Sequence, residues 1–255
     1  MLSKNQIKFL NSLKQKKGRE DEQLFIVEGV KMVAELLNSK INVTQLYATS
    51  TYLEREKIRG TLEIIEIKES ELERISALST PNEVLVLCKI PKLIFDINQL
   101  KDKLTLVLDN IKDPGNLGTI IRIADWFGIE NIVCSKETVD VYNPKVVQAT
   151  MGSIARVNVN YIALNDLLNA NKIKLNYSVF GTLLNGENIY SKPLPNKGFI
   201  IVGNESKGIS NTLFPFITDK VRIPSFSQFN SNGGEAESLN AAIATAIICS
   251  EFRRR

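Results

Sequence analysis

The stretch LTLVLDNIKDPGNLGTIIRIADWFGIENIVCS, residues 104–135, contains two short apolar runs with a helical pattern between them. The runs LTLVLD and NIVCS consist largely of aliphatic and β-branched residues, which is typical of buried strands. Leu117, Ile120, Ile121, Ala124 and Phe127 follow the i, i+3, i+4 spacing of one buried helical stripe. The stretch therefore predicts a strand, a turn, an amphipathic helix and a second strand.

The same alternation continues toward the C-terminus. Four further runs fit strands: RVNVNYI (156–162), YSVFGTLL (177–184), GFIIVG (198–203) and KVRIP (220–224). Apolar runs that alternate with helices or long loops indicate an α/β fold whose parallel sheet is covered on both faces. Ligands of such sheets bind beyond the carboxyl ends of the strands, so we expect the functional residues there.

Residues 1–90 predict a second, smaller α/β domain. Its strand candidates are LFIVEG (24–29), VTQLYATS (43–50), LEIIEI (62–67) and NEVLVLCKI (82–90), and its helix candidates are GVKMVAELLNS (29–39) and SELERISALS (70–79). The segment PKLIFDINQLKDK (91–103) is then a linker, and residues 104–255 form the larger domain.

Composition limits the classes of function. The chain has 255 residues, 44% of them apolar, which is enough for real cores, and no run approaches the roughly 18 apolar residues of a membrane span. We therefore expect a cytoplasmic protein. The cysteines Cys88, Cys134 and Cys249 are far apart in apolar stretches, so we expect buried thiols, no disulfide and no metal site. The absence of histidine excludes hydrolases that depend on a histidine base.

Basic residues gather at both ends of the chain. The first twenty residues contain six basic side chains against Glu20, and the chain closes on Arg253, Arg254 and Arg255; the six are Lys4, Lys8, Lys14, Lys16, Lys17 and Arg19. Such termini can follow the phosphates of a nucleic acid. A solvated helix and a frayed tail explain the charge equally well.

Arg122 and Trp126 stand one turn apart on the helix of residues 113–129, nearly opposite its buried stripe. An exposed tryptophan beside an arginine favours a partner surface or a nucleic-acid contact over an incidental surface pair. Asn116, at the start of the same helix, is explained by capping of free backbone N–H groups.

Two later stretches also place polar residues at strand ends. FIIVGNESKGIS (199–210) sets Glu205 just after a strand, where it either contacts a ligand or caps a following helix; its glycines match no Walker or dinucleotide-binding loop. The second, residues 223–252, leads from a strand end to a helix opened by Ser238 and Asn240. That helix is apolar nearly all round, so it is central to one subunit or buried between two.

Taken together and in this order, the three stretches resemble the SpoU/TrmH family of RNA ribose 2′-O-methyltransferases. The resemblance rests on an asparagine six positions before an arginine, a G-N-E-x-x-G turn, and I-P followed by S-L-N. The matching residues are Asn116 and Arg122; Gly203, Asn204, Glu205 and Gly208; and Ile223, Pro224, Ser238, Leu239 and Asn240. The N-terminal KKGREDEQLFIVEGVKMVAELL is similar to the family's accessory domain, which resembles ribosomal-protein-like RNA binders and occurs mainly in enzymes that modify ribosomal RNA.

The resemblance implies a parallel sheet with a C-terminal trefoil knot and S-adenosylmethionine as methyl donor. The apolar C-terminal helix and the face carrying Arg122 and Trp126 predict a two-fold homodimer, and the lack of a cluster of metal-ligating residue types predicts donor binding without a metal. The donor would be held by backbone groups at Thr182, Leu183, Gly203, Asn204, Ile223 and Leu239. Arg122 would be the central catalytic residue, holding a phosphate and stabilising developing alkoxide charge. The residues expected to orient Arg122 and the ribose are Asn116, Glu205, Ser238 and Asn240.

The substrate implied is large-subunit ribosomal RNA. A related knotted enzyme acting on transfer RNA and a catalytically silent RNA-binding module remain alternatives; the second predicts loss of Arg122 or of the S-L-N triplet, and both are present. One departure from the family pattern is the loop from Ser225 to Ala236, which is several residues longer than the short connection expected.

Overall fold

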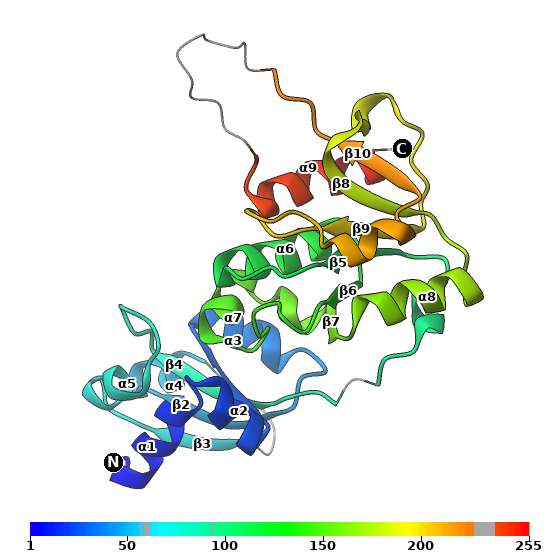
Figure 1. Cartoon of the computed structure of the whole chain (residues 1–255). Coiled ribbons are helices and arrows are strands. Elements are labelled where there is room, and N and C mark those ends of the chain that lie inside the picture. Colours follow the sequence, from blue (N-terminus) through cyan, green and yellow to red (C-terminus); the bar gives the residue numbers. More distant parts are fainter. Residues whose placement is uncertain (57, 59–61, 93, 227–237, 255) are drawn as a thin grey trace. The chain divides into compact units, whose positions relative to one another are not determined.

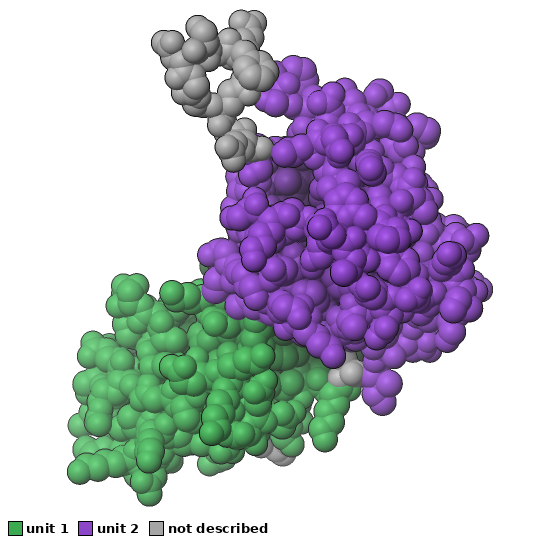
Figure 2. All heavy atoms as spheres, in the orientation of Figure 1, with its two compact units in different colours: residues 1–93, 140–156 green, residues 94–139, 157–255 purple. Residues whose placement is uncertain are grey.

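The computed structural model describes residues 1–56, 58, 62–92, 94–226 and 238–254. The chain divides into two compact units, residues 1–93 with 140–156 and residues 94–139 with 157–255 (Figure 2). The units part inside the predicted linker 91–103. Residues 140–156, assigned from the sequence to the larger domain, instead pack with the N-terminal residues.

The first unit contains a mixed four-stranded sheet in the order β1-β4-β2-β3 (Figure 1). β4 pairs antiparallel with both β1 and β2, and β3 pairs parallel with β2. The strands are β1 (Leu24–Glu28), β2 (Val43–Ala48), β3 (Glu63–Glu66) and β4 (Val84–Lys89). The helices are α1 (Lys4–Ser12), α2 (Lys16–Glu22), α3 (Val30–Leu37), α4 (Ser50–Arg55), α5 (Glu69–Ile75) and α7 (Pro144–Thr150), with the 3₁₀ turn η2 (Ser153–Ala155). The predicted strands and helices of this region are confirmed.

Helix α1 separates its apolar and basic residues. A capping box between Ser3 and Gln6 opens the helix. Ile7 and Leu10 are buried against the core of the first unit, whereas Lys4 and Lys8 are exposed. Helix α1 therefore packs on the core through its apolar residues and presents its lysines to solvent.

The second unit contains a six-stranded sheet in the order β10-β8-β9-β5-β6-β7, and every pairing in it is parallel. Its strands are β5 (Leu104–Leu108), β6 (Asn131–Cys134), β7 (Asn158–Tyr161), β8 (Val179–Asn188), β9 (Gly198–Val202) and β10 (Asp219–Arg222). Its helices are α6 (Pro114–Trp126), α8 (Leu164–Lys174) and α9 (Ala241–Arg253), with the 3₁₀ turns η1 (Ile97–Leu100), η3 (Ile189–Ser191) and η4 (Asn211–Phe216). The predicted α/β class and parallel sheet are confirmed.

Both faces of this sheet are buried, as the unbroken apolar runs predicted. Val107, Val133 and Ile201 form one core cluster with residues of α8, η1 and η4. Leu106 and Ile200 alternate with that cluster and are also fully buried, on the opposite face. Their burial explains why these strands contain apolar residues at every position instead of at alternate ones.

Helices α6 and α9 lie side by side and run parallel. Asn116 and Asn240 are hydrogen-bonded at their N-terminal ends. At the C-terminal ends, the Arg253 guanidinium donates to the carbonyl oxygens of Phe127 and Gly128. Arg253 therefore satisfies carbonyls at the end of α6, where a cation is favoured, and is not the free phosphate contact that the basic C-terminus suggested.

Three further expectations can be compared with the structure. The cysteines are buried, as predicted, and burial raises the pKa of the Cys249 thiol to about 12. The segment after GNESKG forms the 3₁₀ turn η4 instead of the expected α-helix, and its Pro215 removes one backbone donor. The long loop from Ser225 to Ala236 lies almost entirely outside the described residues. Among the described helices, none is long and apolar enough to cross a membrane.

Candidate active site

The start of α6 brings the first group of polar residues into place. Its N-cap is Asp113, whose side chain accepts a hydrogen bond from the Asn116 backbone N–H at 2.7 Å. The capping role suggested for Asn116 is therefore wrong, because the helix begins three residues earlier. The Asn116 side chain is free to act elsewhere. It donates to Glu205 Oε1 at 2.5 Å and accepts from Asn240 Nδ2 at 2.8 Å.

The turn after β9 holds Glu205 in place. Asn204 Oδ1 accepts from the backbone N–H groups of Ser206 and Lys207, and Asn204 and Gly208 exchange backbone hydrogen bonds. A Cβ atom on Gly203 would lie 2.3 Å from the Gly208 carbonyl carbon, so only glycine permits this close approach. The turn is thus closed by its own backbone, which explains the glycines of the G-N-E-x-x-G motif.

Asn204 also ties this turn to the neighbouring strand. Its Nδ2 donates to the carbonyl oxygen of Asn110, which follows β5, at 3.0 Å, and lies 3.4 Å from Glu205 Oε2. β5 and β9 are adjacent in the sheet, so both contacts lie at the carboxyl ends of neighbouring strands. Glu205 is therefore held from two sides, by Asn116 and by Asn204.

Asn240 joins this group through Asn116. As the N-cap of α9 it accepts from the backbone N–H groups of Ala242 and Ile243 through Oδ1, which leaves Nδ2 to donate to Asn116. The predicted opening of this helix by Asn240 is confirmed. The result is a chain of side-chain hydrogen bonds from Asn240 through Asn116 to Glu205, joining three segments far apart in the sequence.

A cavity of about 520 Å³ opens beside this chain of hydrogen bonds, within the range of roughly 300–1,000 Å³ of small-molecule sites. All six residues predicted to bind the cofactor line it, together with Glu205 and Ser238. The full lining is Thr182, Leu183, Leu184, Asn185, Val202, Gly203, Asn204, Glu205, Ser206, Lys207, Gly208, Val221, Arg222, Ile223, Ser238, Leu239, Ala241, Ala244 and Ile248. The walls are mainly aliphatic, with amide, hydroxyl and carboxylate groups along one side.

Arg122 lies apart from this group. It is exposed on α6 and makes no hydrogen bond or ion pair within the described part of the chain. Among the described residues of the single chain, the hydrogen-bond partners of Glu205 are Asn116 and Asn204, and Arg122 is not one of them. Trp126, one turn further on, is 85% exposed, and Ile243 on the neighbouring helix α9 is 55% exposed.

The sequence reasoning missed several residues of the cavity. Asn185, Lys207 and Arg222 line it, and Asn110 supplies the carbonyl that holds Asn204. Asn185 and Arg222 lie next to residues that were identified, so proximity to a strand end was the available signal. Asn110 adopts a positive φ of 61°, which asparagine tolerates better than most residues, and this gave no signal in the sequence.

The comparisons with known proteins match two separate regions of the chain. The SpoU rRNA Methylase family model matches residues 103–250, more than half of the sequence. The chain belongs to the SpoU rRNA methylase family. The predicted family is thereby confirmed. The model of the MRM3-like substrate binding domain matches residues 4–86.

Relatives of this SpoU family member share both regions. The 23S rRNA (guanosine(2553)-2′-O)-methyltransferase RlmP of Bacillus subtilis is 29% identical, over 98% of this chain and 97% of the relative. A TrmH-family structure from Porphyromonas gingivalis is 41% identical with a TM-score of 0.87, covering 100% of this chain and 99% of that one. An AdoMet-bound rRNA methyltransferase from Sinorhizobium meliloti is 27% identical with a TM-score of 0.85, covering 100% and 97%.

Proposed function

We propose that this SpoU family member transfers a methyl group from S-adenosylmethionine to a ribose 2′-hydroxyl of large-subunit ribosomal RNA. The observation that carries the proposal is the single cavity at the strand ends, which gathers all six expected cofactor residues beside the Asn116, Glu205 and Asn240 hydrogen bonds. The Bacillus subtilis relative is named for this reaction on 23S rRNA, and the Sinorhizobium meliloti structure contains AdoMet.

The cavity fits S-adenosylmethionine in its chemistry as well as its size. Its aliphatic walls, including Leu183, Ile223 and Leu239, suit an adenine ring, and Gly203 lines the cavity without a side chain. The Glu205 carboxylate lies at the cavity and would attract a sulfonium cation. When bound, the cofactor supplies an electrophilic methyl group. We further propose that the C-terminal part of the second unit is folded as a trefoil knot.

The protein's part in the reaction is alignment and charge stabilisation. Displacement on a methyl carbon requires the 2′-oxygen and the sulfur in line, so positioning supplies much of the acceleration. The Arg122 guanidinium has five N–H donors and no acceptor, so it serves as a donor, holding the neighbouring phosphate and stabilising developing alkoxide charge. Asn116, Glu205, Ser238 and Asn240 orient the ribose and the cofactor at the cavity.

A two-fold homodimer completes this arrangement. The parallel pair α6 and α9 presents Arg122, Trp126 and Ile243 to solvent, and an exposed apolar surface of this kind favours a protein partner. A second copy of the chain would bury Ile243 and Trp126. It would also bring its own Arg122 toward the cavity of the first copy, which Arg122 of the same chain does not line. In this homodimer α9 would be buried between the two subunits, which is one of the two arrangements expected from its sequence.

Mass mapping of methylated nucleotides in ribosomal RNA from a deletion strain tests the substrate. Loss of one ribose methylation, restored by purified protein with tritiated donor, supports the proposal. Methylation of transfer RNA alone would favour the related tRNA enzyme, and binding of RNA without methyl transfer would favour the silent module. Ribosomal RNA as substrate agrees with the cytoplasmic location expected from the sequence, which stays a prediction.

A further inference from the structure

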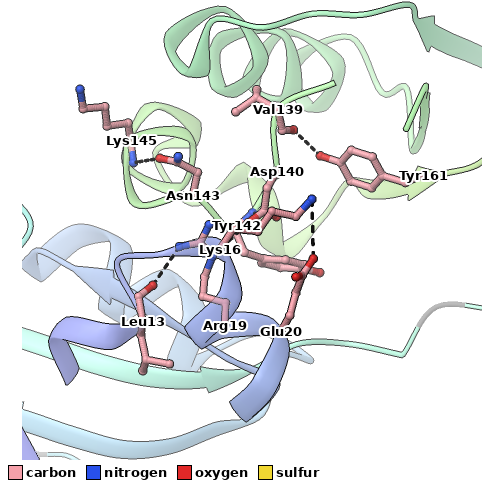
Figure 3. Close-up of polar contacts among 10 residues, drawn as sticks. All are labelled: Leu13, Lys16, Arg19, Glu20, Val139, Asp140, Tyr142, Asn143, Lys145 and Tyr161. Atoms are coloured by element: carbon pink, nitrogen blue, oxygen red, sulfur yellow. Dashed lines mark hydrogen bonds and ion pairs between the residues drawn. The ribbon is translucent and has the colours of Figure 1, made fainter. Parts of the chain in front are cut away.

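The connection between β6 and β7 passes from the second unit to the first at one peptide bond. Val139 belongs to the second unit and Asp140 to the first. The segment that follows, residues 140–156, contains α7 and packs against β1 of the first unit before the chain returns to β7. The two residues of this junction are each held by a different unit (Figure 3).

On the side of the first unit, the anchor is Arg19. Its side chain is 2% exposed, and all three guanidinium nitrogens are used. Nε and Nη2 donate to Asp140 Oδ2 at 3.0 and 2.6 Å, and Nη1 donates to the Leu13 carbonyl oxygen at 2.9 Å, a bond drawn in Figure 3. Arg19 is therefore not available to RNA phosphates, contrary to what its place in the basic N-terminal segment suggested.

A buried guanidinium is costly unless its donors are satisfied, and a planar fork is suited to two bonds on one carboxylate. The turn that follows Asp140 orients its carboxylate, because Oδ1 accepts a hydrogen bond from the Tyr142 backbone N–H at 3.0 Å. The Tyr142 ring packs on Phe25 of β1, with centroids 4.7 Å apart. Asp140 is thus fixed on the first unit by charge, by hydrogen bonds and by the ring beside it.

On the side of the second unit, Val139 is held through its backbone. Its carbonyl accepts from the Tyr161 hydroxyl at 2.6 Å, drawn in Figure 3, and its N–H donates to the Ile111 carbonyl at 2.9 Å. Ile111 follows Asn110, whose own carbonyl accepts from Asn204. Asn204 in turn closes the turn that contains Glu205, so the junction lies two hydrogen-bonded steps from the candidate active site.

We propose that Arg19 is a positioning residue for methyl transfer. By holding Asp140, it fixes the residue that follows Val139, whose N–H donates to the carbonyl of Ile111. The loop of residues 109–112, which also holds the Asn204 turn through the Asn110 carbonyl, is thereby kept in the arrangement that methyl transfer needs. This inference rests on the proposed function, because it assigns RNA binding to the first unit and methyl transfer to the second.

The test compares three variants of the full-length chain. Asp140→Asn removes the charge and keeps the shape, Arg19→Lys keeps the charge and loses the planar fork, and Arg19→Met removes both. Glu35→Gln is the matched control, because Glu35 pairs with Arg156 at the far end of the same segment, but in an ion pair that is about half exposed. Each protein is assayed well below its melting temperature for kcat, RNA affinity and S-adenosylmethionine affinity.

We expect kcat with ribosomal RNA fragments to fall about tenfold or more in Asp140→Asn and further in Arg19→Met, since small displacements at a reacting centre are costly. Affinities for RNA and for S-adenosylmethionine should be unchanged, with partial recovery in Arg19→Lys. The control should behave as wild type. A purely structural role would lower the melting temperature and leave kcat in place, and that result would overturn the proposal. So would a weakened RNA affinity that accounts for the whole loss.

Hydrogen exchange separates this inference from the proposed function. If the wild-type protein methylates no RNA, the proposed function fails, but the mechanical link can still be measured. We expect exchange of the backbone amides of residues 109–112 and 204–208 to rise about tenfold in Asp140→Asn, with β4 unchanged. Unchanged exchange in these segments would rule out the link whatever the enzyme's substrate.

Discussion

Two parts of one helix differ in how their polar groups are satisfied. At the start of α6, Asn116 uses both ends of its amide within the chain, on Glu205 and Asn240. Two turns later, exposed Arg122 has no partner among the described residues, and Trp126 lies open beside it. The difference teaches that one chain satisfies the polar groups at the start of α6 by itself, whereas the face that carries Arg122 stays open; we propose that RNA and a second copy of the chain cover that face.

Replacing Arg122 should have the largest effect. Arg122→Ala is expected to lower kcat by about a hundredfold to a thousandfold, the size seen when a donor to developing negative charge is removed. Arg122→Lys should also be poor, because an ammonium lacks the planar fork. S-adenosylmethionine binding, measured by calorimetry, should persist. The exposed Lys172→Ala on α8 is the control. Near-normal turnover of Arg122→Ala would remove the arginine from the mechanism.

A charge on the open face should separate the subunits. Ile243→Asp would bury a carboxylate in the proposed interface, and we expect the dimer dissociation constant to rise about a hundredfold, as for loss of a strong interface contact. Light scattering across a dilution series measures it. Ile173→Asp on α8 is a matched control, because Ile173 is likewise an exposed isoleucine on a helix, with 82% of its surface accessible. A wild-type protein that is monomeric and active at micromolar concentration would contradict the dimer.

Replacing Asn116, whose side chain is hydrogen-bonded within the chain, should lower kcat less than replacing Arg122. Asn116→Ala takes away one hydrogen bond to Glu205 and one from Asn240, so we expect kcat to fall roughly tenfold through loss of alignment. The helix itself should remain, because Asp113 caps it. Methyl-transfer assays on the same RNA measure the loss, and the exposed Asn169→Ala on α8 controls for the substitution. A loss as large as that of Arg122→Ala would mean that the two parts of α6 are equally indispensable.

The smallest effect should come from the cap. Asp113→Ala removes the acceptor for the Asn116 backbone N–H and should lower the free energy of unfolding by about 1 kcal/mol. Thermal unfolding would show a shift of about 2–4 °C for a domain of this size. Asp113→Ser, which retains a capping oxygen, should restore most of it. If Asp113→Ala abolished activity at low temperature, Asp113 would have a role in the reaction beyond capping.

Much of the site could be predicted because its signals are local. Apolar runs and their bounding turns marked the ends of β9 and β10, and the S-L-N triplet marked the start of α9. The residues chosen there, with Thr182 and Leu183 of β8, meet in one cavity. Asn116 was identified by motif, but its explanation as a cap was wrong, because the cap is Asp113. The role of Asn110 could not be predicted, since its contribution is a backbone carbonyl.

The position of residues 140–156 in the fold could not be predicted from local sequence patterns. Val146 and Val147 mark a buried face of α7, but the sequence does not say which surface covers it. That surface belongs to the first unit, with β1, so the domain boundary predicted along the chain and the division seen in space differ.

The sequence by itself determined the α/β class, the positions of the strands and the family, because periodicity and motif spacing are properties of neighbouring residues. Only the tertiary structure decided which polar groups are free. Arg19 and Arg122 have the same side chain, and each lies on a helix. One is buried on Asp140, 121 residues away, and the other is exposed. The physical reason is that an arginine's partner is chosen by the fold, which brings distant carboxylates to some guanidinium groups and leaves others to water or to a ligand.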